Sequence, residues 1–516
     1  MKLLPLGVQH FDKLIQDNCV YVDKTQLIHQ LTTTGQIYFL SRPRRFGKSL
    51  LVSTLKHLFQ GNKILFKDLW IEDKWDWSKT HPIIHLSFAV LDFVEDNLAA
   101  AISERLHKIA GELGVVLTKK TYKSQFEELI ELLYKKSKQQ VVILIDEYDK
   151  PIVQYLEYDT MGQAEKNQKI LKNFYSALKD AGAMIRFLFI TGVSKFSKVS
   201  LFSDLNHMTD LTMRATYAAL TGYTQAELTH YFDDYLKRAV AVTEMPYEQL
   251  LAEMHAWYDG YSWDGKTWVY NPFGTLQFLS EPEFRNYWFE SGTPTFLIHQ
   301  MKRHGQFQLE NIWVEDGFLE KYDLDNVAII PLLFQTGYLT VKEKNKYPVR
   351  YRLDFPNKEV RESMYRFILD ELAPNPLRTN TGMTVEDLKF AFETNNLVRV
   401  RAIITSVLAD LPHDTFKDGS EGLYHGVIHI LFQYLGATLQ SEVHSSIGRA
   451  DTVVQTPTHV YIFEFKIKES ADAALRQIVR NRYADKYRAS NKPILAIGVK
   501  FNPQNRSIES WRTKKL

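Results

Sequence analysis

The sequence contains a single cysteine, Cys19, among 516 residues. One cysteine excludes an intramolecular disulfide and is typical of a protein kept in a reducing cytosol. No apolar run approaches the roughly 20 residues that a membrane-spanning helix requires. Pro5 interrupts the apolar N-terminal stretch, so a signal-peptide core is not expected either. These absences predict a cytoplasmic protein with no membrane segment.

Low-complexity tracts and repeats are also missing. The composition, 45% hydrophobic and 24% charged, is that of a folded globular protein, and the length suits about three domains of roughly 150 residues. The net charge of +2 hides an asymmetry, because residues 466–516 carry 13 Lys/Arg against 4 Asp/Glu, a net of +9. A basic C-terminal segment indicates a polyanionic partner. From charge alone, a solvated basic helix face is an equal alternative.

A strand–loop–helix pattern surrounds Gly47-Lys48-Ser49. Apolar residues 37–40 lead into a short basic loop, and leucines at helical spacing follow Lys48. Such an order lets a helix N-terminus and a lysine bind phosphate while a hydroxyl ligates Mg²⁺. The complete motif has glycine where this chain has Arg42, so the pattern alone is half a P-loop.

A second strand supplies the acids that ATP hydrolysis requires. Residues 141–145 are all apolar and run into Asp146 and Glu147. Asp146 would hold the Mg²⁺ shell, and Glu147 would polarise the attacking water. A strand that ends in acids is common when taken singly, but this order and spacing after Gly-Lys-Ser favour nucleotide binding. Three further positions, at the end of a buried strand over 186–192, could sense the γ-phosphate: Thr191, Ser194 and Lys195.

Strands alternate with helices throughout this part of the chain. We expect helix over 11–31, a strand over 82–88, and helices near 95–113, 121–138 and 165–181. Alternation of this kind predicts a parallel sheet with ligands at the carboxyl ends of the strands.

The middle of the chain has a different order. Residues 215–275 are helical and rich in aromatics, which suits a lid packed over a nucleotide. Residues 326–370 predict a helix, a hairpin and a second helix, the order of a winged-helix element. Such elements read DNA in some proteins, but the mixed charges here favour a packing role. Residues 374–376 mark a linker.

The last 130 residues contain a second candidate site. Asp451 opens a hairpin whose second strand, 460–466, places Glu464 and Lys466 on one face. Two neighbouring carboxylates favour a shared divalent cation, and a lysine beside them suits metal-assisted phosphodiester hydrolysis. An exposed hairpin with an ordinary Glu464–Lys466 ion pair is the alternative. The basic helix expected next favours a nuclease, because it can hold phosphates; it comprises Arg476, Gln477, Arg480, Arg482 and Lys486. His425 and His429, one helical turn apart, would also suit a metal, but no third His or Cys ligand is evident, so we interpret them as helix-face residues near the site.

The motifs together resemble a bacterial family that pairs a predicted AAA-type ATPase with a C-terminal PD-(D/E)XK nuclease domain. The resemblance runs nearly end to end and rests on residues 21–25 (YVDKT), 39–49 (FLSRPRRFGKS), 145–151 (IDEYDKP), 190–196 (ITGVSKF), 258–261 (YDGY), 424–426 (YHG), 448–451 (GRAD) and 463–466 (FEFK). In this family the loop has Arg42, so its presence identifies the motif.

The resemblance implies an ATP site with Mg²⁺ and a nuclease site that takes Mg²⁺ or Mn²⁺. The residues expected to bind the nucleotide are Arg44, Arg45, Gly47, Lys48, Ser49, Asp146 and Ser194, with Glu147 catalytic and with Ser49 and Asp146 on the metal. The residues expected at the nuclease site are the metal ligands Glu421, Asp451 and Glu464, of which the last two are also catalytic, together with the catalytic Lys466. Gln477 and Tyr483 match positions that often assist.

The predicted fold class is α/β. We expect a P-loop NTPase parallel sheet with a helical lid and a winged-helix-like middle region, followed by an α/β PD-(D/E)XK nuclease-like domain. The expected domains are an AAA-type ATPase core (1–213), the lid (214–300), the winged-helix-like region (301–376) and the nuclease-like domain (377–516).

The leading hypothesis for function is a nuclease gated by ATP, with DNA favoured over RNA as substrate. Proteins with this pairing of domains are suspected in defence against foreign DNA. One alternative is a signalling switch whose C-terminal domain only binds nucleic acid or a protein partner. A DNA-remodelling motor is a third, for which Arg214 and Arg238 are the candidate arginine fingers. AAA-like cores often assemble, so a homo-oligomer is left open.

Overall fold

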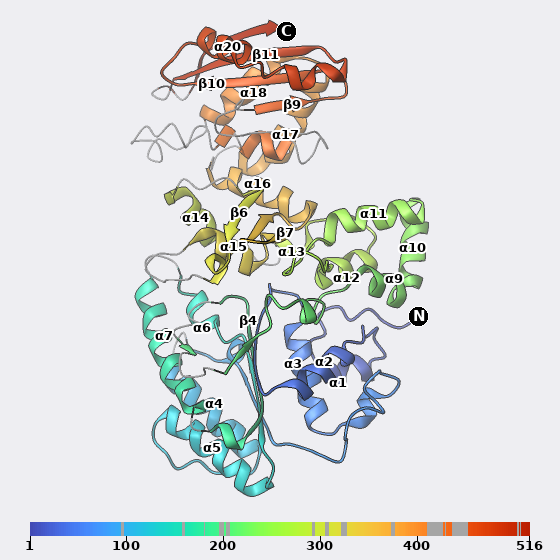
Figure 1. The fold of residues 1–516 in the computed structure, drawn as a ribbon, viewed down its shortest axis with the longest axis vertical. Coiled ribbons are helices and arrows are strands. Elements are labelled where there is room, and N and C mark those ends of the chain that lie inside the picture. The colour runs from blue at the N-terminus through green and yellow to red at the C-terminus, as the bar shows by residue number, and fades with distance from the viewer. Residues whose placement is uncertain are drawn as a thin grey trace. The chain divides into compact units, whose positions relative to one another are not determined.

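The computed structural model contains two compact units, Met1–Phe296 with Leu309–Asn357, and Leu297–Gln308 with Lys358–Leu516 (Figure 1). Among the residues that the structure describes, no helix is both long and apolar enough to cross a membrane. The structure describes residues 1–93, 97–156, 160–179, 181–195, 201–202, 207–290, 295–304, 309–320, 328–372, 377–409, 427–428, 430–435, 452–502, 505 and 507–516.

The first unit is built on a parallel sheet with the strand order β2-β3-β4-β1-β5. Its strands are β1 (Ile37–Ser41), β2 (Ile83–Ser87), β3 (Val141–Asp146), β4 (Ile185–Gly192) and β5 (Thr209–Asp210). Every residue of β3 is buried, as expected for a strand covered on both faces. The α/β class predicted from the alternating pattern is confirmed.

Helices cover both faces of this sheet (Figure 1). One face carries α1 (Phe11–Gln16), α2 (Thr25–Thr34) and α3 (Lys48–Phe59), and the other carries α4 (Leu98–Glu112), α5 (Tyr122–Ser137), α6 (Lys150–Val153) and α7 (Met161–Tyr175). The predicted helix over 165–181 starts earlier, at Met161, and 3-10 turns replace it after Tyr175.

The helix predicted across residues 11–31 is wrong in its middle. Residues 19–22 are not helical, and their side chains alternate between two hydrophobic clusters. Cys19 and Tyr21 pack into the core beneath the sheet, whereas Val20 and Val22 pack against the helices that follow the sheet. In an extended segment successive side chains point to opposite sides, so alternate residues can reach the two clusters. A helix could not place them in this way. This segment is therefore the seam between the sheet and the later helices.

Those helices form a region of their own within the first unit. They are α9 (Gln225–Tyr231), α10 (Asp233–Thr243), α11 (Tyr247–Tyr258), α12 (Pro272–Ser280) and the short α13 (Tyr287–Glu290). A partly buried ion pair joins this region to the seam: Lys24 Nζ lies 2.6 Å and 2.7 Å from the two carboxylate oxygens of Glu227. Glu227 also completes the capping box of α9 with Thr224.

The helix–hairpin order predicted near residue 330 is present. The elements are α15 (Ile329–Thr336), β7 (Thr340–Lys346) and β8 (Val349–Asp354), followed by α16 (Lys358–Leu372). A strand not expected from the sequence, β6 (Ile312–Glu315), pairs with β8 and extends the hairpin to three strands. The division between the units falls between Asn357 and Lys358.

The second unit contains a mixed sheet with the strand order β12-β11-β10-β9. Its strands are β9 (Thr452–Gln455), β10 (Val460–Lys466), β11 (Ile494–Asn502) and β12 (Ser507–Lys515), and its helices include α14 (Thr295–His304), α17 (Leu377–Glu393), α18 (Leu397–Ala409) and α20 (Ala471–Arg480). The hairpin β9–β10 was predicted, whereas β11 and β12 were not. The predicted basic helix is shorter than expected: it ends at Arg480, since Arg482 has a left-handed φ of 55° and Lys486 lies in a 3-10 segment.

We expect the Lys24–Glu227 pair to stabilise the first unit. The Lys24→Gln substitution leaves a half-buried carboxylate without its cation, so the free energy of unfolding should fall by about 1–3 kcal/mol. Urea titration of the full chain, followed by tryptophan fluorescence, measures the change. The matched control is Lys74→Gln, which removes the exposed pair with Asp73 and should leave the urea midpoint unchanged, because water and salt screen exposed charges. Equal effects of the two substitutions would contradict this role.

Candidate functional site

The loop at residues 42–47 joins β1 to α3 at the carboxyl end of the sheet. Arg45 and Gly47 both have left-handed backbone angles, with φ of 67° and 79°, and nothing lies within 4 Å of a Cβ built on Gly47. The turn starts α3 directly after Gly47 and directs the first amides of the helix outward. The Lys48 side chain is buried and folds back over the loop, donating to the carbonyls of Arg42 (2.9 Å) and Pro43 (2.7 Å).

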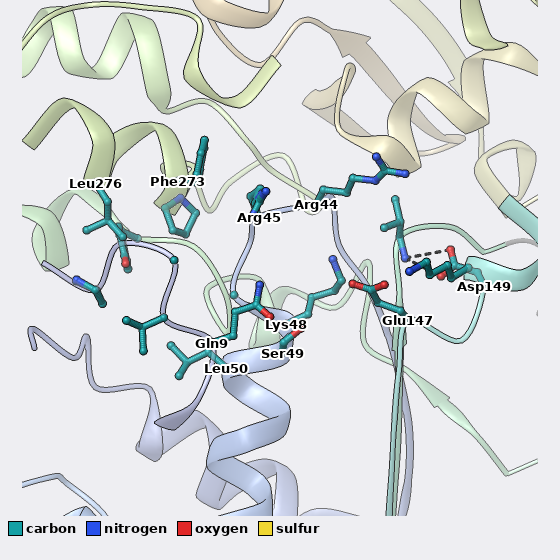
Figure 2. A pocket seen from close by; sticks show the side chains of 18 of the residues that line it. Gln9, Arg44, Arg45, Lys48, Ser49, Leu50, Glu147, Asp149, Phe273 and Leu276 are labelled. Carbon is teal, nitrogen blue, oxygen red and sulfur yellow. Dashed lines mark hydrogen bonds between the residues drawn. The ribbon is translucent and has the colours of Figure 1, made fainter. Parts of the chain in front are cut away.

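A pocket of about 550 Å³ lies against this loop (Figure 2). One end is charged and contains the α3 N-terminus with the side chains of Arg44, Lys48, Ser49 and Glu147 (Figure 2). Phe273 and Leu276 line the other end, where the Arg45 guanidinium lies beside the Phe273 ring, and Pro5, Val8 and Tyr223 add further apolar lining to the pocket. The pocket thus combines a cationic, amide-rich end with an apolar one, an arrangement that suits a phosphorylated ligand with an aromatic base.

The two predicted acids lie at the end of β3. Asp146 is 4% exposed, and burial raises its pKa, while hydrogen bonding from the Ser49 hydroxyl opposes this shift. Glu147 has a left-handed φ of 52° and lines the pocket. Burial lowers the pKa of Lys48, and the neighbouring carboxylates, Asp146 first among them, act in the opposite direction. Ser49, Lys48 and both acids are therefore brought together.

Ser194, also predicted to bind the nucleotide, lies behind the pocket wall. Its hydroxyl donates to the Asp149 carboxylate at 2.6 Å, as does its amide at 2.7 Å, and the Val193 amide donates at 3.1 Å. Asp149 and Val193 line the pocket, whereas Ser194 does not. Burial raises the pKa of Asp149, and the hydrogen bonds from Ser194 counter that shift. Asp149 thus ties the end of β3 to the end of β4.

Sequence reasoning missed Asp149 as a site residue. The available signal was its place in the IDEYDKP stretch, three residues after Asp146. The sequence alone does not reveal the role of this third acid. The amides that donate to it follow β4, more than 40 residues away along the chain.

Arg42, the residue in place of the motif glycine, is fully buried. Its guanidinium donates to the carbonyls of Ser41 (3.0 Å), Thr212 (2.9 Å) and Tyr217 (3.3 Å) and lies 3.7 Å from the centroid of the Trp263 ring. Burial lowers the pKa of Arg42 to about 9, with Asp210 and Asp264 acting in the opposite direction. Arg42 is thus a packing residue that connects the loop to the segment after β5 and to the α11–α12 connection.

In the second unit, Glu464 and Lys466 lie on one face of β10, as predicted. Lys466 Nζ is 2.9 Å from a Glu464 carboxylate oxygen, and the Glu464 side chain is only 2% exposed. Phe463 and Phe465 project from the opposite face, where they meet the Phe432 ring. The other predicted ligands, Asp451 and Glu421, lie outside the described residues, as do His425 and His429. Within the described part of the chain no group of three or more His, Cys, Asp or Glu could hold a metal ion.

Two family models match regions of the chain that contain these residues. A family model described as "Predicted AAA-ATPase" matches residues 5–202, and one described as "PD-(D/E)XK nuclease superfamily" matches residues 419–511. The chain is also similar to the "Uncharacterized protein in vnfD 5'region" of Azotobacter chroococcum mcd 1, with 39% identity over 530 residues, covering 100% of this chain and 99% of that protein. The chain belongs to the family of predicted AAA-type ATPases with a C-terminal PD-(D/E)XK nuclease domain.

Membership of this AAA-ATPase and PD-(D/E)XK family confirms the resemblance drawn from the motifs. The AAA-ATPase match contains the 42–47 loop and both acids at the end of β3. The nuclease-superfamily match contains Glu421, Asp451, Glu464 and Lys466. It ends at residue 511, so it covers strand β11 and the first five residues of β12 as well. ATPase and nuclease domains are therefore both present in one chain.

Arg42 should be required for the fold of the AAA-ATPase domain. Arg42→Lys keeps the charge but cannot donate to three carbonyls or stack on Trp263 as a planar group. We expect a loss of about 2–4 kcal/mol in the free energy of unfolding, measured by urea titration of the full chain. Arg285→Lys is the control, because Arg285 is 58% exposed in its pair with Glu283. An unchanged unfolding midpoint in Arg42→Lys would refute the assignment.

Proposed function

We propose that this protein binds and hydrolyses ATP at the 42–49 pocket, and that its nucleotide state controls a metal-dependent nuclease in its C-terminal domain. The observation that carries the proposal is the convergence of the α3 N-terminus, Lys48, Ser49 and Glu147 on one pocket. The pairing of Lys466 with the buried Glu464 carboxylate supports the nuclease half.

The residues of the pocket fit ATP with Mg²⁺. The helix N-terminus and Lys48 suit the phosphates, and the apolar end, with Phe273 and Leu276, suits the base. Ser49 and Asp146 already share a hydrogen bond and offer the hydroxyl and carboxylate oxygens that Mg²⁺ prefers. Mg²⁺ would supply charge neutralisation at the phosphates. Glu147, which lines the same pocket, would orient the attacking water and receive its proton.

The nuclease site fits a hard divalent cation. We propose Glu421, Asp451 and Glu464 as its oxygen ligands, because Mg²⁺ and Mn²⁺ bind carboxylates. The metal would act as a Lewis acid on the phosphodiester. Lys466, 2.9 Å from Glu464, would position the water that attacks phosphorus. Arg476 and Arg480 are exposed on α20, where they could hold the phosphates of a nucleic acid, with DNA proposed over RNA.

Contacts of the 42–47 loop support control of the nuclease by nucleotide. Trp288 Nε1 donates to the Arg44 carbonyl at 2.9 Å, and Pro43 lies so close to Gly337 that a Cβ there would come within 2.6 Å of it. Gln335 of α15 accepts a hydrogen bond from the Lys195 amide, which follows β4. The α15–β7–β8 element thus contacts both the loop and the end of β4.

The chain runs directly from that element into α16 of the second unit. A shift of the loop on ATP binding could therefore be passed along the chain. We propose that four domains transmit this shift: the ATPase core (1–213), the lid (214–300), the winged-helix-like region (301–376) and the nuclease-like domain (377–516). A cytoplasmic protein acting against foreign DNA, alone or as a homo-oligomer, is the setting that the domain pairing suggests.

The proposal is tested by separating the two activities. Lys466→Ala and Asp451→Ala should each reduce Mg²⁺- or Mn²⁺-dependent cleavage by at least about 100-fold and leave ATP binding unchanged. Lys48→Ala should abolish ATP binding. Cleavage is measured on single- and double-stranded DNA and RNA, with and without ATP, and binding is measured by titration with labelled ATP.

Lys468→Ala is the matched control, because Lys468 is exposed just beyond β10. Full cleavage by both nuclease-site variants would overturn the assignment. If the purified chain retains nucleotide but cleaves none of the four substrates in a metal screen, the C-terminal domain serves binding alone, and the signalling switch is the better description.

A further inference from the structure

Four cationic side chains line the nucleotide pocket, and three of them are held by neighbouring groups. Lys48 donates to the carbonyls of its own loop, and Lys150 Nζ donates to the Ala89 carbonyl at 2.9 Å. The Arg45 guanidinium lies 5.0 Å from the centroid of the Phe273 ring, at the apolar end. The fourth is Arg44.

Arg44 differs from the others in having a fixed backbone and a free head group. Its carbonyl is held by Trp288, and the ring of Phe46, two residues on, packs against Tyr261 and Trp263 at centroid distances of 4.8 Å and 5.7 Å. Its side chain is exposed, and among the described residues its guanidinium has no hydrogen-bond or ion-pair partner. The Arg44 backbone is therefore held in place, while its guanidinium is exposed and can contact a ligand.

The two loop arginines leave the loop in different directions. Figure 2 shows Arg44 extending away from Phe273, with its guanidinium above Glu147 in this view, whereas the Arg45 guanidinium lies beside the Phe273 ring. The attacking water would lie on the side of Glu147, since Glu147 would orient it. Lys48, four residues further along the chain than Arg44, lines the same pocket.

The other candidate arginines lie elsewhere. Arg238 on α10 donates to the carbonyls of Leu279 and Ser280 at the end of α12. Arg214 is exposed and lies near Tyr38, in the first half of β1, whereas ligands approach the opposite end of that strand. Neither lines the pocket.

ATP hydrolysis needs a cation beside the γ-phosphate, and Arg44 lines the pocket in which that phosphate would lie. The water oxygen forms a bond to the γ-phosphorus while the bond from that phosphorus to the β–γ bridging oxygen breaks. The electron pair of the broken bond stays on the bridging oxygen of ADP, and the water proton passes to Glu147. Negative charge therefore grows on the bridging and γ oxygens, and a guanidinium stabilises it strongly.

We propose that Arg44 is the catalytic arginine of ATP hydrolysis and acts within its own chain, so that no arginine from a second copy is required. The inference rests on the proposed ATPase function. The proposal gives the two neighbouring arginines different roles. Arg44 stabilises the charge that develops on the phosphate oxygens in the transition state, and Arg45 contributes to ATP binding at the Phe273 end.

Steady-state ATP hydrolysis by the full-length chain tests this division. Arg44→Ala should lower kcat by about 10³-fold or more with less than a threefold change in the Kd for ATP. Arg44→Lys should recover only a small part, because a lysine presents a single point charge. Arg45→Ala should instead raise the KM for ATP and leave kcat within about threefold. Arg214→Ala, far from the pocket, should match the wild type.

Dilution and mixing distinguish an arginine in the same chain from one in a second copy. Hydrolysis per chain should be independent of protein concentration, and mixing Arg44→Ala with Lys48→Ala chains should restore nothing. Recovery on mixing, or a kcat of Arg44→Ala within twofold of the wild type, overturns the proposal while leaving the ATPase function intact. A wild-type chain that neither binds nor hydrolyses ATP overturns both.

Discussion

The burial of the Arg42 cation is the constraint on which the ATPase domain depends. A guanidinium taken out of water is costly unless hydrogen bonds and charge compensate for it. Here three backbone carbonyls and the face of Trp263 do so, and these groups come from β1, from the segment after β5, and from the α11–α12 connection. The 42–47 loop can therefore take its shape only when all three segments are in place.

This dependence couples the nucleotide site to parts of the chain that lie far away in sequence. The segment around Trp263 also pairs with the hairpin element, because the Ser262 amide and carbonyl both contact the Thr340 hydroxyl and the Val341 amide donates to the same carbonyl. The loop, the helical region and the hairpin element thus share one hydrogen-bonded network. A ligand that binds the loop differently in two states could bias that network, which is the physical requirement for control at a distance.

Much of the fold could be predicted, because its signals are local. The apolar run 141–145 predicts a strand buried on both faces, and the alternation along 460–466 predicts that Glu464 and Lys466 share one face of a strand. Errors arose where a segment serves two neighbours. The side chains of residues 19–22 alternate between two clusters, and the helix predicted over 11–31 did not take this short extended segment into account. Strand β12 is rich in Lys and Arg, so its composition resembled an exposed polar tail rather than an edge strand.

The sequence by itself determined the chemistry that is available: a lysine and hydroxyl at a helix start, two acids at the end of a buried strand, and an acid–lysine pair on one strand face. These follow from covalent order and from the periods of helix and strand. Only the tertiary structure decided which groups are free to act. Arg42 and Ser194 are committed to backbone carbonyls and to Asp149, whereas Arg44 is anchored at its carbonyl and open at its guanidinium. Their partners come from segments tens to hundreds of residues away, and only folding brings those segments together.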